Sequence, residues 1–127
     1  MTEIAIQSVD AAEVVRRQLD AYNARDIDAF MAHWADDAQV FAWPSQLMSD
    51  GADAIRALHV ERFKEPSLFA HLVSRVAVGN LVIDREVVTR TFPEGPGTLD
   101  VIGIYEVEDG KIARAWFKRG EPMMGGR

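Results

Sequence analysis

Three charged side chains are placed by their spacing on one face of a predicted hairpin. The pair Gly79-Asn80 lies between two runs rich in β-branched residues, which is a typical hairpin signal. A two-residue turn there puts Arg75 directly opposite Asp84 and leaves Glu86 two residues further along on the same face. The pattern therefore predicts two carboxylates and one guanidinium as near neighbours.

Such a cluster suits acid–base chemistry if its face lines a pocket. Charges inside a pocket are costly unless they are paired, so ionisable groups found there often have a role. Glu86 could act as a general base whose pKa is tuned by burial, with Arg75 or Arg90 holding an anion. The competing interpretation is a plain cross-strand ion pair between Arg75 and Asp84, with Glu86 as the partner of a neighbouring arginine.

The first half of the chain predicts the helices that would close such a pocket. Asp10 and Glu13 have the spacing of a capping box, and Asp26 can cap a second, short helix. A third helix is expected to start near residues 50–51 and to end before Pro66, because the residue before a proline is pushed out of the α region. The apolar positions of the three helices are Val15, Leu19 and Tyr22, then Ile27, Phe30, Met31 and Trp34, then Ile55, Leu58 and Phe63.

The remaining segments predict strands and turns. Asp36-Asp37 is interpreted as a solvated helix end, and residues 40–43 as a short strand stopped by Pro44. Residues 92–98 hold two prolines and two glycines and are expected to form a loop. Helices followed by long strands are typical of the α+β class. The long strands are expected at 68–78, 81–91, 99–107 and 111–119.

The last hairpin decides which side chains face inward. A three-residue loop with Gly110 in the left-handed region would form a bulged turn, whereas a two-residue turn at Asp109-Gly110 would pair Ile104 with Ala115. With the bulged turn both faces carry apolar residues, so we expect a second copy of the chain to cover the outer face. The inner face would then hold Val101, Gly103, Tyr105, Ala113, Ala115 and Phe117, and the outer face Ile102, Ile104 and Trp116.

Composition narrows the class of protein and of partner. The 127 residues fit a single domain, 1–127, and a net charge of −6 argues against nucleic acid or an anionic membrane as a partner. Cysteine is absent, which excludes disulfide and thiolate chemistry. No signal peptide or membrane span is visible, so a cytoplasmic protein is expected. His33, His59 and His71 are scattered, and we expect neither a metal site nor a cofactor.

Four stretches together resemble the SnoaL-like and ketosteroid-isomerase branch of the nuclear-transport-factor-2-like superfamily. The stretches are 22–28, 34–38, 51–56 and 99–112, and the resemblance covers residues 12–119. It implies a cone-shaped, cystatin-like domain in which N-terminal helices pack on a curved antiparallel sheet around a pocket, often as a homodimer. Members include isomerases, polyketide cyclases, epoxide hydrolases, dehydratases and non-enzymes, so this fold does not settle function.

The resemblance argues against isomerase chemistry. The isomerases use a carboxylate base, together with a tyrosine and a protonated aspartic acid that stabilise an enolate oxygen. The tyrosine position looks like Gln18, the base position like Ala42 and the second acid position like Gly103. These residues lack the required groups, so the chain is interpreted as not a ketosteroid isomerase. The Gly103 position also carries the acid that looks catalytic in the polyketide cyclases, so that activity loses support as well.

The same correspondence suggests other site residues. It places Glu86 and Arg90 at pocket-facing positions that are apolar in the isomerases, and His59 where they have a supporting tyrosine. The epoxide hydrolases of this fold hold a water with an Asp-Arg-Asp arrangement. Asp84, Arg75 and Glu86 supply the same residue types, but their spacing does not match that motif. The alternative for His59 is a surface or satisfied core histidine.

We therefore predict a pocket for a small hydrophobic ligand. The chain could be an isomerase-, hydrolase- or cyclase-type enzyme with Glu86 as base, assisted by Asp84, Arg75 or His59. The alternative is a non-catalytic ligand-binding domain, or a domain that dimerises through the outer sheet face. A cavity of about 300 Å³ or more with Glu86 at its wall would favour the enzyme. The predicted lining is Gln18, Tyr22, Trp34, Trp43, Phe63, His71, Val88, Arg90, Val101, Gly103, Tyr105 and Phe117.

Overall fold

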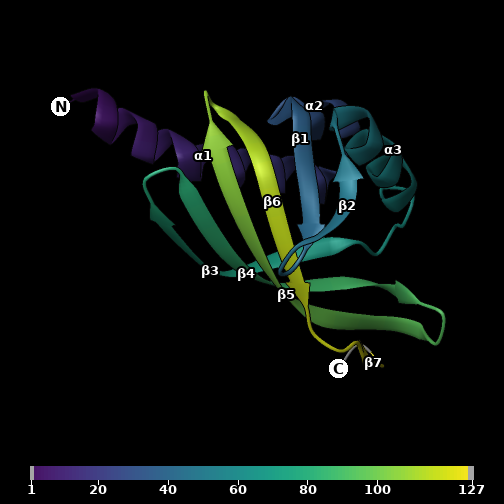
Figure 1. The fold of residues 1–127 in the computed structure, drawn as a ribbon. Helices are drawn as coiled ribbons and strands as arrows, with labels where there is room; N and C mark the ends of the chain where they lie inside the picture. The colour runs from purple at the N-terminus through teal and green to yellow at the C-terminus, as the bar shows by residue number, and fades with distance from the viewer. Residues whose placement is uncertain (1, 126–127) are drawn as a thin grey trace.

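Three helices and seven strands make up the part of the chain that the structure describes. This computed structural model describes residues 2–125, and side chains for residues 11–125. The helices are α1 (Thr2–Ala24), α2 (Ile27–Met31) and α3 (Ala52–Arg62). The strands are β1 (Trp34–Ala42), β2 (Gln46–Asp50), β3 (Phe69–Val78), β4 (Leu81–Phe92), β5 (Gly95–Glu108), β6 (Lys111–Arg119) and β7 (Met123–Met124) (Figure 1).

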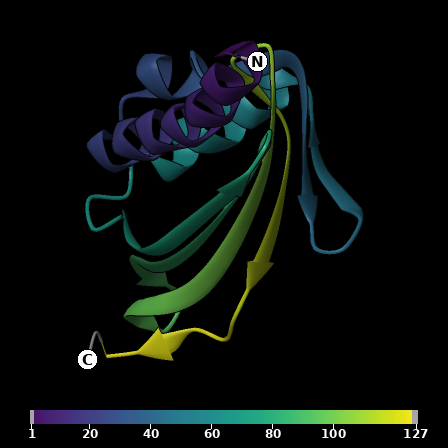
Figure 2. The same cartoon turned by 90° about the vertical axis from the view of Figure 1, so that its left-hand side faces the viewer.

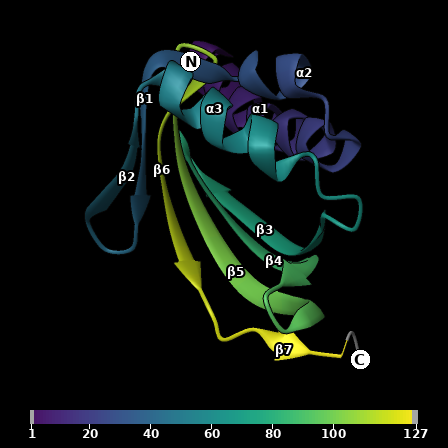
Figure 3. The ribbon, with the colours of Figure 1, turned by 90° about the vertical axis from the view of Figure 1, so that its right-hand side faces the viewer.

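The strands form one curved sheet, and the helices pack on one side of it. The strand order is β2-β1-β6-β5-β4-β3, with β7 paired to β5. Figure 2 shows α1 lying across the sheet, which bends away beneath it, and Figure 3 shows α3 beside α1 on the same side. The predicted α+β class, with N-terminal helices packed on a curved sheet, is confirmed. The sheet is mixed rather than wholly antiparallel, because β1 and β6, which no hairpin joins, pair in parallel.

The helices begin and end for local reasons. The Asp26 side chain accepts a hydrogen bond from the Ala29 backbone N–H at 3.1 Å and caps α2, as predicted. The third helix starts after Gly51 and ends four residues before Pro66, also as predicted. The first helix begins at Thr2, so Asp10 lies inside it rather than at its start.

Residues 34–50 differ from the prediction. Asp36 and Asp37 do not end a helix but lie within β1, where both side chains are exposed. This strand pairs with β6 on one side and β2 on the other, and β2 was not predicted. Pairing with a strand from the far end of the chain outweighs the low strand propensity of aspartate. A short stretch of sequence gives no sign of such a distant partner.

The first strand hairpin has the predicted register at its turn. Val78 pairs with Leu81 and Arg75 with Asp84. A register shift between Leu72 and Ser74 then inserts one extra residue into β3. In the part of β3 before this bulge, each side chain therefore faces the side of the sheet opposite to the one predicted. The inner face of β3 therefore continues through Leu72, and the residue before it points outward.

The segment 92–98 is not a loop. Strands β4 and β5 extend through it, with Phe92 paired to Gly95 and Thr89 to Thr98, so the connection is a tight turn at Pro93-Glu94. Pro96 is tolerated on the outer side of this pairing, where its carbonyl accepts a hydrogen bond from Gly125 at 3.1 Å. The long hairpin extends the inner face of the sheet beyond the helices (Figure 1).

The last hairpin has the predicted faces but reaches them differently. Tyr105 pairs with Ala115 and Ile104 with Trp116. The turn itself has two residues, Asp109 and Gly110, both with positive φ (53° and 76°), and the extra residue, Ala113, sits in a bulge just after it in β6. The bulge restores the inward and outward alternation that the two-residue turn alone would have shifted.

Packing of the helices on the inner face creates the core. Phe30, Ile55 and Ile112 are fully buried in its main cluster. The Asn23 side chain donates to the Ala70 carbonyl at 2.9 Å and accepts from the Ala70 N–H at 2.8 Å, so α1 is fastened to β3. None of the helices in the described part of the chain is long and apolar enough to span a membrane.

Candidate functional site

A cavity of about 90 Å³ lies between the helices and the inner face of the sheet. This is smaller than the volume of about 300 Å³ that would by itself favour an enzyme. A second depression, of about 300 Å³, adjoins it and shares Leu58, Arg62 and Arg90 with the cavity wall. The two together form an inner chamber and an outer vestibule.

Glu86 lies at the wall of the inner chamber with an unsatisfied carboxylate. It comes from the inner face of β4 and is only 4% exposed. Among the described residues its Oε2 has no hydrogen-bond partner. Burial, and next the nearby charge of Asp84, raise the pKa of Glu86 from 4.5 to about 7, against the opposing effect of Arg75. Near neutral pH this carboxyl group can therefore both accept and release a proton.

Asp84 and Arg75 form an ion pair behind the chamber. Arg75 Nε donates to Asp84 Oδ1 at 2.7 Å and its Nη2 to Oδ2 at 2.9 Å, a bidentate arrangement. Asp84 is fully buried, and neither residue lines the cavity. The hydrogen bonds that Arg75 donates to Asp84 raise the pKa of Arg75. The pair thus has the geometry of a plain cross-strand ion pair, which was the competing interpretation. It does not contact the cavity and could influence a ligand there only through its effect on Glu86.

Hydrogen-bond donors face the same chamber. Trp34 Nε1 is buried without a partner among the described residues, and Trp34 lines the cavity. Tyr105 also lines it, and burial, followed by the charges of Glu86 and Asp84, holds the pKa of its hydroxyl well above 10. The phenol therefore stays protonated and can donate. An orphaned donor and an orphaned acceptor in one chamber indicate that a polar group, from water or a ligand, belongs there.

His59 presents a neutral ring to the chamber. Burial lowers its pKa from 6.5 to about 4, with the Arg62 charge adding to the effect. Its Nδ1 lies 2.8 Å from the Ile55 carbonyl, and this bond requires the proton to be on Nδ1. The other ring nitrogen, Nε2, is then an acceptor at neutral pH. His59 packs against Phe30 with ring centroids 4.5 Å apart, so its position is fixed by the core.

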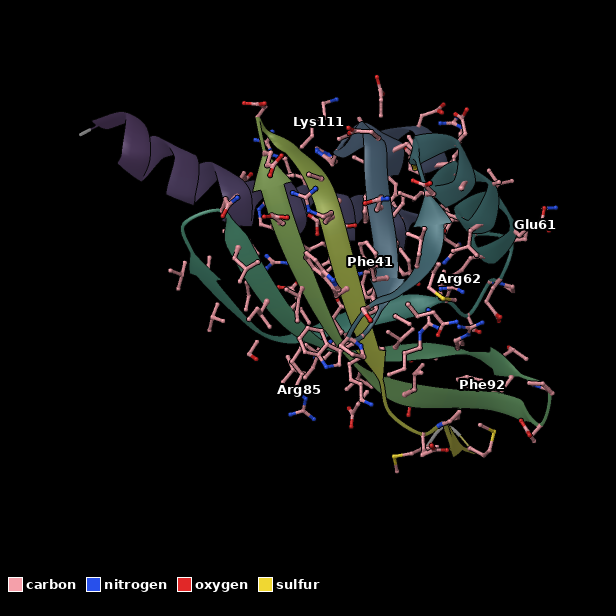
Figure 4. The ribbon with its side chains drawn as sticks, in the orientation of Figure 1. Phe41, Glu61, Arg62, Arg85, Phe92 and Lys111 are labelled. Atoms are coloured by element: carbon pink, nitrogen blue, oxygen red, sulfur yellow. The ribbon has the colours of Figure 1, made fainter. Side chains whose placement is uncertain are left out.

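Three arginines lie at the opening between the two spaces: Arg62 and Arg90 line both, and Arg119 lines the inner chamber. Arg62 comes from α3, Arg90 from β4 and Arg119 from the end of β6. Burial, and then the charges of Arg62 and Arg90, lower the pKa of Arg119. The Arg90 guanidinium lies 5.4 Å from the centre of the Phe92 ring. Figure 4 places Arg62 at the end of α3 that lies above the β4–β5 hairpin, on which Phe92 is labelled.

Most of the predicted lining residues come together at this cavity, and four do not: Trp43, Phe63, His71 and Gly103. Trp43 follows β1 and is 51% exposed, because the chain turns there into the unpredicted strand β2. Phe63 packs edge-on against Tyr22, at 5.4 Å between ring centres, and fills core instead. His71 is exposed on the outer face because of the bulge in β3. The predicted residues that do line the cavity are Gln18, Tyr22, Trp34, His59, Glu86, Val88, Arg90, Val101, Tyr105 and Phe117.

Gly103 makes room for two of these rings. A Cβ atom at this position would lie 3.0 Å from the Tyr105 ring and hydroxyl and 3.0 Å from the Phe117 ring. The position that the resemblance equates with an isomerase acid is thus covered by the hydroxyl of Tyr105. Ala42, equated with the isomerase base, ends β1 opposite Phe117.

Sequence reasoning missed several lining residues. Alternation along β6 carries the inner face from Phe117 to Arg119, a signal that was available once the register was known. Arg62 and Leu58 lie one turn apart on α3, and only the packing of that helix brings them to the opening. The other missed lining residues are Leu19, Phe30, Val40, Ser49, Ala70 and Leu99. Among the described side chains, no group of three or more potential metal ligands is present.

Comparison with known proteins supports one family. The sequence profile of the SnoaL-like domain matches residues 15–115. A search of curated proteins finds no match. Among solved structures, an uncharacterized cystatin-fold protein from Novosphingobium aromaticivorans is 27% identical, with a TM-score of 0.77 over 84% of this chain and 96% of that one. A candidate polyketide cyclase from Sinorhizobium meliloti is 30% identical, with a TM-score of 0.69 over 87% and 98%.

A more distant structure has the same fold. An LEH-like epoxide hydrolase from M. tuberculosis is 19% identical, with a TM-score of 0.75 over 89% of this chain and 84% of that one. At this identity the likeness concerns the fold alone.

Proposed function

Because the chain belongs to the SnoaL-like domain family, we propose that it binds a small hydrophobic metabolite in the chamber and that Glu86 transfers a proton on this ligand. The observation that carries the proposal is the buried, unpartnered carboxylate of Glu86 at the cavity wall, with a pKa raised to about 7. A general base works best when its pKa lies near the working pH.

The proposed step is proton abstraction next to a carbonyl group. The Glu86 carboxylate takes the proton, the C–H bond breaks, and its electron pair forms a carbon–carbon double bond while negative charge moves to the carbonyl oxygen. Tyr105 and Trp34 supply the O–H and N–H groups that can stabilise this oxygen, since both line the chamber. Return of the proton from Glu86 to another atom of the ligand completes an isomerisation, or accompanies ring closure in a cyclisation.

This step would not repeat the arrangement of the ketosteroid isomerases. By the resemblance, the positions of the base and of the second acid in those enzymes correspond to Ala42 and Gly103 here, whose side chains have no ionisable group. Here the base would come from the middle of β4, and the donor from the Tyr105 hydroxyl that lies over Gly103. The base would accordingly act from a different wall of the chamber than in the isomerases.

A test of this function does not require the natural substrate. Small aromatic ketones in D2O exchange their α-protons when a base is positioned beside them, and NMR follows the exchange. We expect the protein to accelerate exchange for at least one ketone, and E86Q to reduce the acceleration by a factor of about 100 or more. E86Q should remain folded by circular dichroism. Unchanged exchange in a folded E86Q protein would refute the role of Glu86.

A non-catalytic ligand-binding or dimerisation domain is the second candidate. The small volume of the chamber favours the dimerisation form of this candidate, because ligand pockets usually exceed about 300 Å³. The outer sheet face favours it too: Ile102 is 41% exposed there, and the neighbouring Phe41 and Trp116 rings stack at 5.7 Å. We propose that two copies of the chain associate through this face. Ligand binding without proton exchange would select this candidate.

A further inference from the structure

The three arginines at the opening lack acidic partners. Arg62, Arg90 and Arg119 come from three different elements yet line one cavity. Within residues 11–125, none of them has a carboxylate oxygen within 4.0 Å of its guanidinium nitrogens. Two arginines outside the cavity do have one: Arg16 contacts Asp20 at 2.9 Å, and Arg114 contacts Glu108 at 3.0 Å.

The nearest acids of the vestibule wall are already engaged. Glu61 pairs with Lys64 at 3.0 Å, and the Glu65 carboxylate accepts a hydrogen bond from the Ser67 hydroxyl at 2.6 Å. Inside the chamber, the charges that act on Glu86 are those of Asp84 and Arg75 rather than those of the opening. Glu65 keeps its charge and interacts with Arg90, but only from beyond 4.0 Å. The mutual repulsion of the three guanidinium groups is therefore compensated by the described residues only in part.

The space beyond the arginines is mainly apolar. Leu19, Val88 and Leu99 line the chamber on its way toward Glu86. A ligand that satisfies both regions has an apolar body and a negatively charged end. Guanidinium groups suit that end, because their planar donors match the oxygens of carboxylates and phosphates.

We propose that the ligand of this pocket is an apolar molecule with an anionic headgroup, carboxylate or phosphate, which Arg62, Arg90 and Arg119 bind at the opening while the apolar body extends toward Glu86. This inference rests on the pocket being a ligand site, as proposed above. Anchoring the headgroup would fix the orientation of the body, so the same carbon would be presented to the base in each turnover.

Matched probe pairs test the headgroup. Phenylacetate and phenylacetamide differ mainly in charge, as do benzyl phosphate and its neutral dimethyl ester. NMR titrations should show at least one anion binding about tenfold more tightly than its neutral counterpart. The better of the two anions identifies the headgroup. The preference should weaken as salt is added, because salt screens the interaction.

Variants locate the effect at the opening. R62Q/R90Q/R119Q should lose the preference for the anion, whereas R17Q/R85Q/K118Q, which removes the same charge from outside the cavity, should keep it. The single variant R90Q should lose part of it, and provides the same test should the triple variant fail to fold. We also expect the folded triple variant to melt at a higher temperature than the wild type, because repulsion is relieved.

Two outcomes would overturn the inference. One is equal binding of the charged and neutral probes by the wild-type protein, including no binding of either. The other is an equal loss of preference in the control triple variant. E86Q separates this inference from the proposed chemistry: it should keep the anion preference while losing proton exchange. If the wild-type protein catalyses proton exchange but shows no preference for anionic probes, the headgroup assignment is wrong and the proposed role of Glu86 stands.

Discussion

Asp84 and Glu86 lie two residues apart on the inner face of β4, but only Asp84 has a counterion. The Arg75 guanidinium binds both oxygens of Asp84 at 2.7 and 2.9 Å, whereas Glu86 Oε2 has no partner among the described residues. Arg75 pairs with Asp84 rather than with Glu86 because it lies directly opposite Asp84 in the register of the hairpin. Burial, and next the negative charge of Asp84, therefore keep the Glu86 carboxyl group protonated up to about neutral pH, against the opposing effect of Arg75.

The first prediction concerns the stability of this ion pair. R75A removes the counterion of a fully buried carboxylate, and we expect a loss of about 3–5 kcal/mol in the free energy of unfolding, measured by urea denaturation. R85A is the matched control. Arg85 lies on the opposite face, with its side chain 54% exposed and 3.5 Å from Asp100, and should change stability by less than about 1 kcal/mol. Figure 4 shows Arg85 pointing away from the rest of the molecule. Similar losses in both variants would contradict the buried pair.

The second prediction concerns pH. The pKa of Glu86 is raised in the folded protein, from 4.5 to about 7, so the folded state holds this proton more tightly than the unfolded state. The associated stability is fully present below pH 4.5 and is lost as the pH rises through about 7. A shift of this size corresponds to roughly 3 kcal/mol.

E86Q isolates this effect. Its glutamine side chain does not ionise, so urea unfolding should show E86Q gaining stability relative to the wild type between pH 5 and 9. Other titrating groups, His59 among them, contribute equally to both proteins and cancel in the difference. A constant difference across this pH range would show that the pKa of Glu86 is not raised. Any proton exchange catalysed by the wild type should increase through pH 7, as the carboxylate forms.

The third prediction concerns the close approach at Gly103. G103A introduces a Cβ atom 3.0 Å from the rings of Tyr105 and Phe117, both of which line the chamber. We expect thermal and urea unfolding to show a loss of about 1–3 kcal/mol, because the rings must shift. At Gly120 the nearest atoms to an added Cβ, in Asp100, are 3.6 Å away, so G120A should change stability by less than about 0.5 kcal/mol. Equal effects would indicate that the two rings move freely.

The fourth prediction concerns association through the outer sheet face. We expect light scattering after size exclusion to give the mass of a dimer for the wild type and of a monomer for I102K, since a lysine in an apolar interface loses its hydration. V60K changes a residue of α3 that is 40% exposed, on the helical side, and should remain dimeric. If the wild-type protein is monomeric at micromolar concentration, the proposed dimer is wrong.

Local sequence patterns determined the parts of this protein that depend on near neighbours. Capping by Asp26 and the turn at Gly79-Asn80 involve residues only a few positions apart, so the second helix and the pairing of Arg75 with Asp84 were predictable. Period-two alternation likewise predicted that Glu86 and Tyr105 would face inward, because side chains of a strand alternate between its two faces.

Tertiary structure decided what depends on contacts between distant segments. The strand β1 was misjudged because its partner β6 lies more than seventy residues further along the chain, and His71 was misplaced because a bulge in β3 shifted the alternation by one residue. The arginine opening had no sequence signature, since Arg62, Arg90 and Arg119 become neighbours only when a helix end and two strands are packed together. The small chamber volume is likewise a property of packing, because it depends on how closely the aromatic rings of several elements approach one another.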